Sequence, residues 1–142
     1  MKKNQNSLES LKSENKTLAA LDLGSNSFHL IIARKEKNTF KIIDKYKETI
    51  GLAAGLNKEN ELSAKAQQKA LSCASKIAKR INASKPDLIK IVGTSTFRLT
   101  RKSCDLLENL QSILNHKVNV ISGSEEARLI FLGVTTALKD CK

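Results

Sequence analysis

Asp22-Leu23-Gly24-Ser25-Asn26-Ser27 is a short polar turn between two apolar runs, residues 18–21 before it and residues 28–33 after it. This order predicts one strand, a tight turn and a second strand. Hairpin turns need residues that tolerate the left-handed backbone, and Gly and Asn do so. The same turn offers a carboxylate, two hydroxyls and backbone N–H groups, which suit a phosphate with a metal ion beside it. The residues of the turn leave both interpretations open, and the plain hairpin is the simpler one.

The composition indicates one globular domain with a strongly basic surface. The chain has 142 residues, of which 40% are hydrophobic and 27% charged, enough for a single packed core. Lys and Arg number 25 against 14 Asp and Glu, which gives a formal net charge of +11. This excess favours polyanionic partners, although a basic surface without a partner is the alternative. Aromatic residues, at 4%, are too few for base-stacking platforms, so nucleic acid is disfavoured as a partner.

The cysteines and the lack of a long apolar run predict a cytoplasmic protein with reduced thiols, with peripheral association with a membrane as the alternative. Cys73, Cys104 and Cys141 are widely spaced and form no Cys-x-x-Cys pair, so they predict no metal site. No stretch approaches the roughly 20 apolar residues of a membrane span, and no secretory signal is recognisable. Residues 1–16 are polar and are predicted to form a disordered tail before a domain of residues 17–142.

Hydrophobic periodicity predicts an α/β domain. Three strands joined by short links open the chain and indicate an antiparallel meander. A long helix and a nearly continuous apolar run follow, which implies a parallel strand in a sheet with helices on both faces. Two further helices and a buried strand complete the pattern. The predicted strands are 17–22, 27–34, 40–50, 88–92 and 118–121, and the predicted helices are 63–83, a short piece at 97–99, 103–115 and 124–139.

Hydroxyl and cationic side chains follow the apolar run 88–92. Thr94, Ser95 and Arg98 would therefore gather at the C-terminal end of a parallel strand, the edge at which open α/β sheets bind ligands. Residues 51–57 form a loop with two glycines, which is either a plain connection or a mobile wall of that site.

The final predicted helix begins with two adjacent glutamates. Ser122 and Glu125 have the spacing of a capping box, which gives the first glutamate a structural role. Glu126 has no such role and lies at the edge of the apolar face, where a general base and a solvated first-turn glutamate are both compatible with the pattern. His29 is explained as a strand side chain and His116 as a helix-terminus residue, so neither is assigned a catalytic role.

Three motifs in this chain together resemble the N-terminal domain of the exopolyphosphatase / guanosine pentaphosphate phosphatase family. The resemblance runs from about residue 18 to about residue 134, with the motifs in the family's order and spacing. It implies the actin-like ATPase (ribonuclease H-like) fold, as the first of the family's two such domains. The motifs are Asp22-Leu23-Gly24-Ser25-Asn26-Ser27-Phe28-His29, Ile91-Val92-Gly93-Thr94-Ser95-Thr96-Phe97-Arg98 and Ile121-Ser122-Gly123-Ser124-Glu125-Glu126-Ala127-Arg128-Leu129-Ile130, and Leu52-Ala53-Ala54-Gly55-Leu56 also fits.

The resemblance implies Mg²⁺-dependent attack of water on a terminal phosphoanhydride, with release of orthophosphate. In that mechanism Glu126 looks like the base that activates water, Arg98 like the cation that clamps the phosphoryl oxygens, and Asp22 like the metal ligand. The phosphate-binding residues implied in the same way are Gly24, Ser25, Asn26, Ser27, Thr94 and Ser95.

The resemblance leaves the substrate open between inorganic polyphosphate, the first expectation, and guanosine pentaphosphate. The chain ends at Lys142, whereas the family continues into a second Gly-rich phosphate loop and a second domain. A domain that binds a polyanion without turning it over is therefore a further expectation. Gly51 is a smaller departure, because many members carry a basic or polar residue there. Full-length members of the family are often homodimers.

Overall fold

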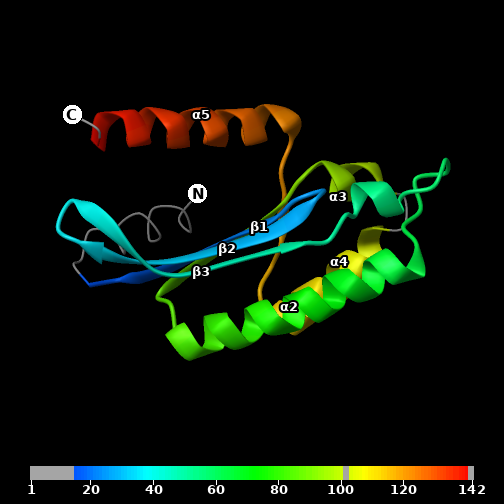
Figure 1. The fold of residues 1–142 in the computed structure, drawn as a ribbon, viewed down its shortest axis with the longest axis horizontal. Coiled ribbons are helices and arrows are strands. Elements are labelled where there is room, and N and C mark those ends of the chain that lie inside the picture. Colours follow the sequence, from blue (N-terminus) through cyan, green and yellow to red (C-terminus); the bar gives the residue numbers. More distant parts are fainter. Residues whose placement is uncertain (1–14, 101–102, 141–142) are drawn as a thin grey trace, which may run out of the picture.

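The computed structural model describes residues 15–100 and 103–140, and the side chains of residues 15–100 and 105–136. Five strands and four α-helices make up this part of the chain (Figure 1). In chain order they are β1 (Thr17–Leu23), β2 (Ser27–Glu36), β3 (Thr39–Thr49), the 3₁₀ turn η1 (Ala53–Gly55), α2 (Ala64–Ser84), β4 (Leu88–Gly93), α3 (Ser95–Leu99), α4 (Ser103–Leu114), β5 (Asn119–Val120) and α5 (Gly123–Asp140).

The strands form one mixed sheet in the order β3-β2-β1-β4-β5. β1 pairs with β2, and β2 with β3, in antiparallel fashion, so the predicted meander is confirmed. β4 joins the other side of β1 in parallel, as the apolar run 88–92 predicted. Helices lie on both faces of the sheet, with α2 and α4 below it and α5 above it in Figure 1.

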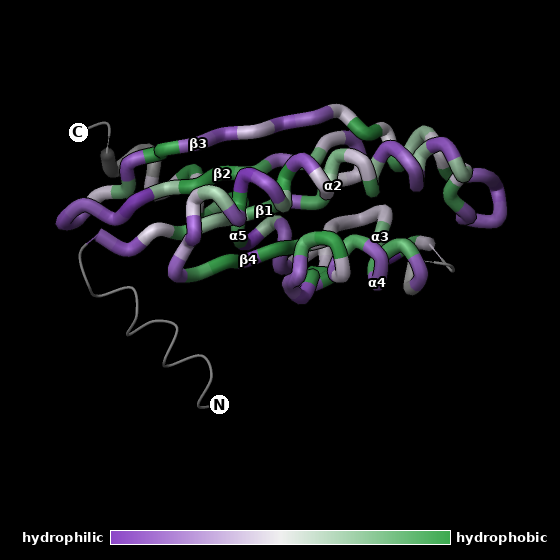
Figure 2. The backbone as a smooth tube through the Cα atoms, turned by 90° about the horizontal axis from the view of Figure 1, so that it is seen from below, coloured by the Kyte–Doolittle hydropathy of each residue, from purple (hydrophilic) through white to green (hydrophobic). Residues whose placement is uncertain are grey.

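The hydrophobic core lies between the sheet and the α2–α4 layer. Strand residues alternate between the two faces of a sheet, and in β2 Phe28, Leu30 and Ile32 are fully buried on the α2 side. Leu21 and Leu23 of β1 add to the same face. Figure 2 shows the apolar colouring of β1, β2 and β4 beside the more hydrophilic β3. The helical residues that complete this core are Ala66, Ala70, Cys73, Ala74, Ile77, Ile81, Leu106, Leu110 and Leu114.

The ends of α2 follow from local chemistry. The Ser63 hydroxyl accepts a hydrogen bond of 3.1 Å from the Ala66 N–H, the N-terminal cap that the sequence predicted. Lys85 ends the helix in the left-handed conformation, with φ 46°, directly before Pro86. Proline disfavours helical geometry in the residue before it, so the helix ends where the sequence predicted, within one residue.

The side chains of β3 divide between the two faces of the sheet by residue alternation. Asp44 and Glu48 lie on the α2 side, where they bind Arg80 at 2.9 Å and Lys76 at 3.1 Å. The Arg80 guanidinium also lies over the Tyr46 ring, 4.6 Å from its centroid. These contacts attach the edge strand β3 to α2, and the neighbouring lysines of β3 fall on the opposite face.

One prediction about the C-terminal part needs correction. The strand predicted at 118–121 as buried contains only Asn119 and Val120, both exposed, because β5 pairs only with the last two residues of β4. The apolar face predicted for the last helix exists in α5, but it is not buried. Ile130 is 63% exposed and Phe131 70% exposed.

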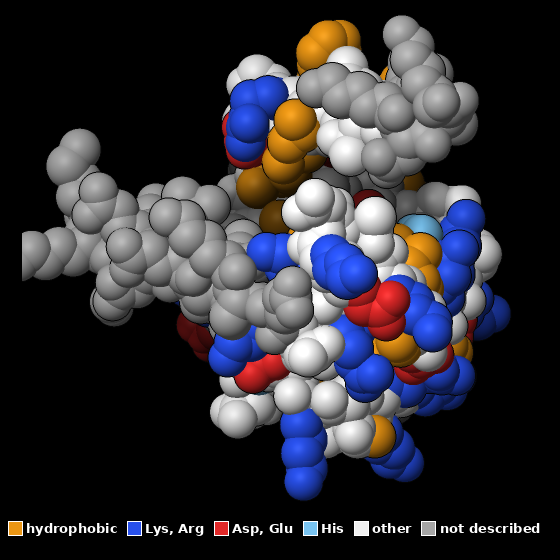
Figure 3. Space-filling model, turned by 90° about the vertical axis from the view of Figure 1, so that its left-hand side faces the viewer, with side chains coloured by type: hydrophobic (Ala, Val, Ile, Leu, Met, Phe, Trp, Pro, Cys, Tyr) orange, Lys and Arg blue, Asp and Glu red, His pale blue; other side chains and the backbone are white. Residues whose placement is uncertain are grey.

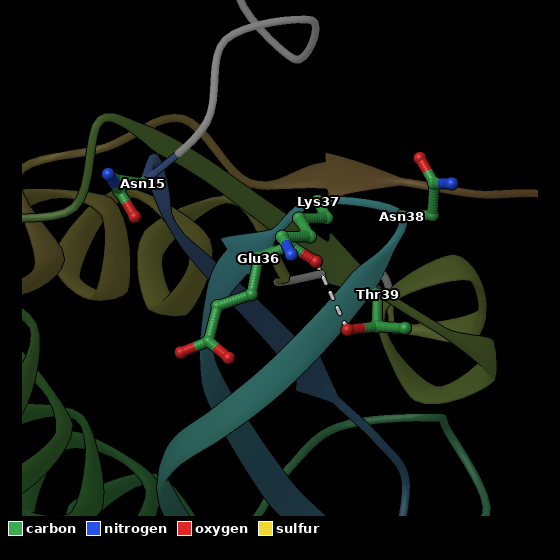
Figure 4. A pocket seen from close by; sticks show the side chains of 5 residues that line it. All are labelled: Asn15, Glu36, Lys37, Asn38 and Thr39. Atoms are coloured by element: carbon green, nitrogen blue, oxygen red, sulfur yellow. Dashed lines mark hydrogen bonds between the residues drawn. The ribbon is translucent and has the colours of Figure 1, made fainter.

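The start of the described chain and the β2–β3 turn form a surface depression (Figure 4). The Asn15 N–H donates to the Lys35 carbonyl at 3.0 Å, and the Thr39 hydroxyl donates to the Glu36 carbonyl at 3.1 Å. The labelled side chains do not converge on one point in Figure 4, so the depression offers no chemical site. Residues 1–14 of the predicted tail lie outside the described residues, whereas Lys16 pairs with Asp87 at 3.7 Å.

The thiol of Cys73 lies in the hydrophobic core. Cys73 is buried and in no disulfide, and burial, with a smaller effect of Glu48, raises the pKa of its thiol to about 12. Such a thiol is a packing group and a poor nucleophile. None of the helices among residues 15–100 and 103–140 has the length and apolar content needed to cross a bilayer.

Truncation at the core and truncation on α5 should have very different effects on stability. Leu30→Ala removes a fully buried side chain, so the free energy of unfolding should fall by about 2–5 kcal/mol. Leu132→Ala removes a side chain that is 52% exposed, and the change should stay within about 0.5 kcal/mol. Urea denaturation monitored by circular dichroism measures both. Equal losses in the two variants would show that α5 is as well packed as the core.

Candidate functional site

Parallel pairing brings the ends of β1 and β4 to one edge of the sheet. Leu23 is the register partner of Gly93, so the turn after β1 and the residues after β4 begin side by side. A cavity of about 160 Å³ opens here, on the face of the sheet that carries α5. The residues that line it are Asp22, Val92, Thr94, Ile121, Glu126, Leu129 and Ile130.

Three carbonyl groups of the turn between β1 and β2 are already occupied by hydrogen bonds from backbone N–H groups. The Gly24 N–H donates to the Ser27 carbonyl at 3.1 Å, and a Cβ at Gly24 would lie 2.8 Å from that oxygen, so only glycine fits. The Ser25 and Asn26 carbonyls accept hydrogen bonds from residues 50–53. No hydrogen bond among the described residues uses the N–H of Ser25 or Asn26. These two donors are therefore available to an anion.

A hydroxyl pair connects the two strand ends. The Ser25 hydroxyl is hydrogen-bonded to the Ser95 hydroxyl, and the Thr94 N–H donates to the Leu23 carbonyl at 3.3 Å. Thr94 is buried and lines the cavity. The structure thus brings together the two segments that sequence analysis assigned to phosphate binding. The contact between Ser25 and Ser95 themselves was not predicted.

Arg98 and Glu126 form an ion pair at the cavity. Both terminal nitrogens of Arg98 donate to Glu126 Oε2 at 3.3 Å, and one of them also donates to the Ile121 carbonyl. The two side chains are 29% and 34% exposed, so the pair is accessible from solvent. Arg98 comes from α3 and Glu126 from the first turn of α5, so the pair joins segments 28 residues apart in sequence.

The adjacent glutamate has a different set of partners. The Ser122 hydroxyl accepts a hydrogen bond from the Glu125 N–H at 3.1 Å, which confirms one half of the predicted capping box. The Glu125 carboxylate instead receives hydrogen bonds of 2.8 and 2.7 Å from Arg128. Arg128 lowers the pKa of Glu125 accordingly. Only Glu126 of the two lines the cavity.

Asp22 sits beside Glu126 in an environment that disfavours its charge. Burial of the carboxyl group, although the residue as a whole is exposed, raises the pKa of Asp22, and the negative charge of Glu126 raises it further. His29 is the register partner of Asp22 and acts in the opposite direction. His29 was given no role from the sequence. The short antiparallel hairpin could have revealed it, because such a turn places residues 22 and 29 opposite each other.

The donors at this edge suit a magnesium ion that shares its ligands with a substrate. Among the residues whose placement is described, no group of three or more His, Cys, Asp or Glu side chains forms a preassembled metal site. Asp22 and Glu126 are two carboxylates at one cavity. Mg²⁺ is commonly held by one or two carboxylates together with substrate phosphates and water, so this donor set fits that ion.

The remaining predicted residues lie near the turn after β1 and do not line the cavity. Gly24 shapes the turn, and Asn26 contributes its carbonyl to the Ile50 and Gly51 N–H groups at 2.7 and 2.8 Å. Ser27 begins β2 and does not line the cavity. Sequence reasoning missed the apolar wall of the cavity, which is formed in part by Leu129 and Ile130 of α5.

The fold and the site define an α/β domain with a mixed sheet and polar groups collected at its strand ends. The family model described as the Ppx/GppA phosphatase family matches residues 31–141. The chain therefore belongs to the Ppx/GppA phosphatase family.

Known relatives agree with this assignment. A guanosine-5'-triphosphate,3'-diphosphate pyrophosphatase from Aliivibrio fischeri is 44% identical over 116 residues, covering 82% of this chain and 23% of that protein. A crystal structure of the Aquifex aeolicus family member matches with a TM-score of 0.80 and 24% identity, over 87% of this chain and 40% of that one. An exopolyphosphatase from Cytophaga hutchinsonii matches with a TM-score of 0.80 and 27% identity, over 85% and 39%. The chain thus spans well under half the length of these relatives.

Asp22→Asn should stabilise the domain at neutral pH. The pKa of Asp22 is raised on folding, so its ionised form is less favourable in the folded than in the unfolded chain. That penalty is present above the folded pKa and disappears below the unfolded value of about 3.9. The melting temperature of the variant should therefore be higher than that of the wild type at pH 7 and equal to it at pH 3.

Asp87→Asn is the matched control with the opposite sign. The Thr17 N–H, which donates to Asp87 at 2.9 Å, lowers the pKa of that carboxylate. Ionised Asp87 thus stabilises the folded chain above its unfolded pKa, and its removal should lower the melting temperature at pH 7. Differential scanning calorimetry at the two pH values measures both variants. A lower melting temperature for Asp22→Asn at pH 7 would contradict the assigned environment.

Proposed function

We propose that this chain is the N-terminal catalytic domain of a phosphoanhydride hydrolase that releases terminal orthophosphate from inorganic polyphosphate. The observation that carries the proposal is the Arg98–Glu126 pair, held at one cavity with Asp22 and beside the turn after β1. Phosphoryl transfer needs positioned donors for the phosphate oxygens and a base for the attacking water, and these residues are chemically suited to both tasks.

The phosphate would be bound first by the turn after β1. The free N–H groups of Ser25 and Asn26 are donors for phosphate oxygens, and the Ser25 and Ser95 hydroxyls lie beside them. The Thr94 hydroxyl at the end of β4 extends this set into the cavity. Gly24 allows the tight approach of the backbone in this turn.

Arg98 would hold the phosphoryl group that is transferred. A guanidinium has five N–H donors, and the hydrogen bonds to Glu126 and Ile121 use three of them. Two donors remain for the phosphoryl oxygens, over which the transition state spreads its negative charge. Arg98 can therefore bind the phosphoryl group while it keeps Glu126 in place.

Glu126 would act as the general base. Its Oε2 atom accepts both hydrogen bonds from Arg98, whereas Oε1 accepts none from the described residues. Oε1 is thus available to orient a water molecule and to take its proton as the oxygen attacks phosphorus. Asp22 would hold Mg²⁺ next to this position, and the ion, when bound, would neutralise charge on the phosphate oxygens.

Guanosine pentaphosphate is the second candidate substrate. It also ends in a phosphoanhydride, and the relative with 44% identity is named for guanosine-5'-triphosphate,3'-diphosphate. The same residues would act on its terminal 5'-phosphate. A third candidate, binding of a polyanion without hydrolysis, is supported by the solvent exposure of the Arg98–Glu126 pair, because exposed charges act more weakly on a substrate.

Glu126→Gln should abolish phosphate release while leaving substrate binding intact. Loss of a general base typically costs about 10²–10⁴-fold in turnover, and the neutral amide keeps the shape of the side chain. Glu125→Gln is the matched control, since it removes the same charge from the adjacent position without touching the cavity. It should change turnover by less than about threefold, in line with an exposed ion pair.

The assay follows orthophosphate release with Mg²⁺ from polyphosphate and from guanosine pentaphosphate. It uses the purified 142-residue chain and the complete product of the gene that encodes it. Undiminished turnover in Glu126→Gln would refute the role of this residue. Binding without release in both proteins, with either substrate, would leave the polyanion-binding function as the correct one.

A further inference from the structure

The charges of β3 are sorted between the two faces of the sheet. Asp44 and Glu48 point toward α2 and are paired with Arg80 and Lys76. Lys45 and Lys47 alternate with them and are therefore on the α5 side. Both lysines are exposed, and neither forms an ion pair with a described acidic side chain. The strand thus neutralises its acids on one face and leaves a pair of cations on the other.

The register places these lysines in line with the cavity. Asp22 of β1 pairs with His29 of β2, and His29 pairs with Lys47 of β3, so the three residues form one row across the sheet. Neighbouring strands are about 4.8 Å apart, and Lys47 therefore lies about 10 Å from Asp22 along this row. In the next row on the same face, Lys45 is the register partner of Ile31.

The α5-side face has an excess of positive charge. Lys90 of β4 is exposed on it as the register partner of Ala20. The glutamates at the start of α5 are already paired with arginines, and Asp22 is the carboxylate contributed by the described sheet residues of this face. Figure 3 shows the end of the molecule that lies at the left of Figure 1, where Lys and Arg side chains are widespread and Asp and Glu side chains lie among them.

We propose that Lys45 and Lys47 bind the part of an anionic substrate that extends beyond the phosphate held at the cavity. This inference rests on the proposed function and assigns it a second contact region. A phosphate chain that starts at the turn after β1 and crosses β2 reaches the lysine pair. The shared chemistry is a remote cluster of phosphates, supplied either by the inner phosphates of polyphosphate or by the 3'-diphosphate of guanosine pentaphosphate.

Exposed lysines act on such a ligand through counterion release and screened attraction. Each contact is weak, but the contacts add along a flexible polyanion and depend steeply on salt. The lysine pair should therefore favour long substrates over short ones, without a part in the chemical step. It differs in this respect from Arg98, which is paired with the cavity residue Glu126.

The test compares Lys45→Gln/Lys47→Gln with Lys65→Gln/Lys69→Gln. The control pair lies on α2, on the other side of the sheet, and is likewise exposed without a described acidic partner. Titration calorimetry with Mg²⁺ measures binding of tripolyphosphate, long-chain polyphosphate and guanosine pentaphosphate to the 142-residue chain at several salt concentrations. Circular dichroism and thermal melting verify that each variant is folded.

The Lys45/Lys47 variant should bind long-chain polyphosphate roughly threefold to tenfold more weakly, with a logarithmic salt slope shallower by about one to two. Its affinity for tripolyphosphate should stay within about twofold of the wild type, and the control variant should match the wild type with every ligand. An equal loss for guanosine pentaphosphate would show that the 3'-diphosphate uses the same lysines, and an unchanged value would restrict them to polyphosphate.

Three results would overturn the inference: no preference of the wild type for long chains, no loss in the Lys45/Lys47 variant, or the same loss in the control. The proposed function is tested separately, with the Arg98→Gln variant. If Arg98→Gln loses tripolyphosphate binding while the lysine variant behaves as the wild type, the cavity remains the phosphate site and only the second contact region is wrong.

Discussion

The parallel pairing of β1 with β4 is the constraint on which the site depends. Leu23 and Gly93 end their strands in register, and the Thr94 N–H continues the pairing to the Leu23 carbonyl at 3.3 Å. A shift by one residue would turn Asp22 into the core and Leu23 out of it, because side chains alternate between faces. The buried side chains of β1 prevent such a shift. The packing of the core therefore also aligns the two polar strand ends.

Local patterns predicted the elements well and the contacts between them poorly. The Ala and Ile repeat in residues 66–81 identified α2, since a helical period needs no knowledge of its partner. The shortness of β5 depends on how few residues of β4 it can reach, which no local pattern contains. The Arg98–Glu126 pair likewise depends on the path of the chain after β5. The motifs suggested that both residues belong to one site, but not that they bind each other.

Strand alternation sorts the charged side chains of β3 between the two faces of the sheet. The sequence Asp44-Lys45-Tyr46-Lys47-Glu48 looks like a simple mixture of charges, with no evident function. In the sheet, the acids and the tyrosine contact α2, whereas the lysines face the side of the cavity. The face of each β3 residue follows from its position in the pairing with β2. A bulge between Ile32 and Ala33 shifts this pairing for the residues at the start of β3, before Asp44. Sequence spacing alone could not assign the faces with certainty at that end.

The exposed apolar side of α5 has a consequence for the precision of the site. Glu126 is held by Arg98 at the first turn of a helix whose later turns carry exposed side chains such as Ile130 and Phe131. Glu126 is thus held by an ion pair at the first turn of a long helix, while the core beneath the sheet is held by hydrophobic packing. Ionic strength weakens the ion pair and leaves that packing almost untouched. The position of the Glu126 carboxylate should therefore become less well defined at high salt well before the fold is lost.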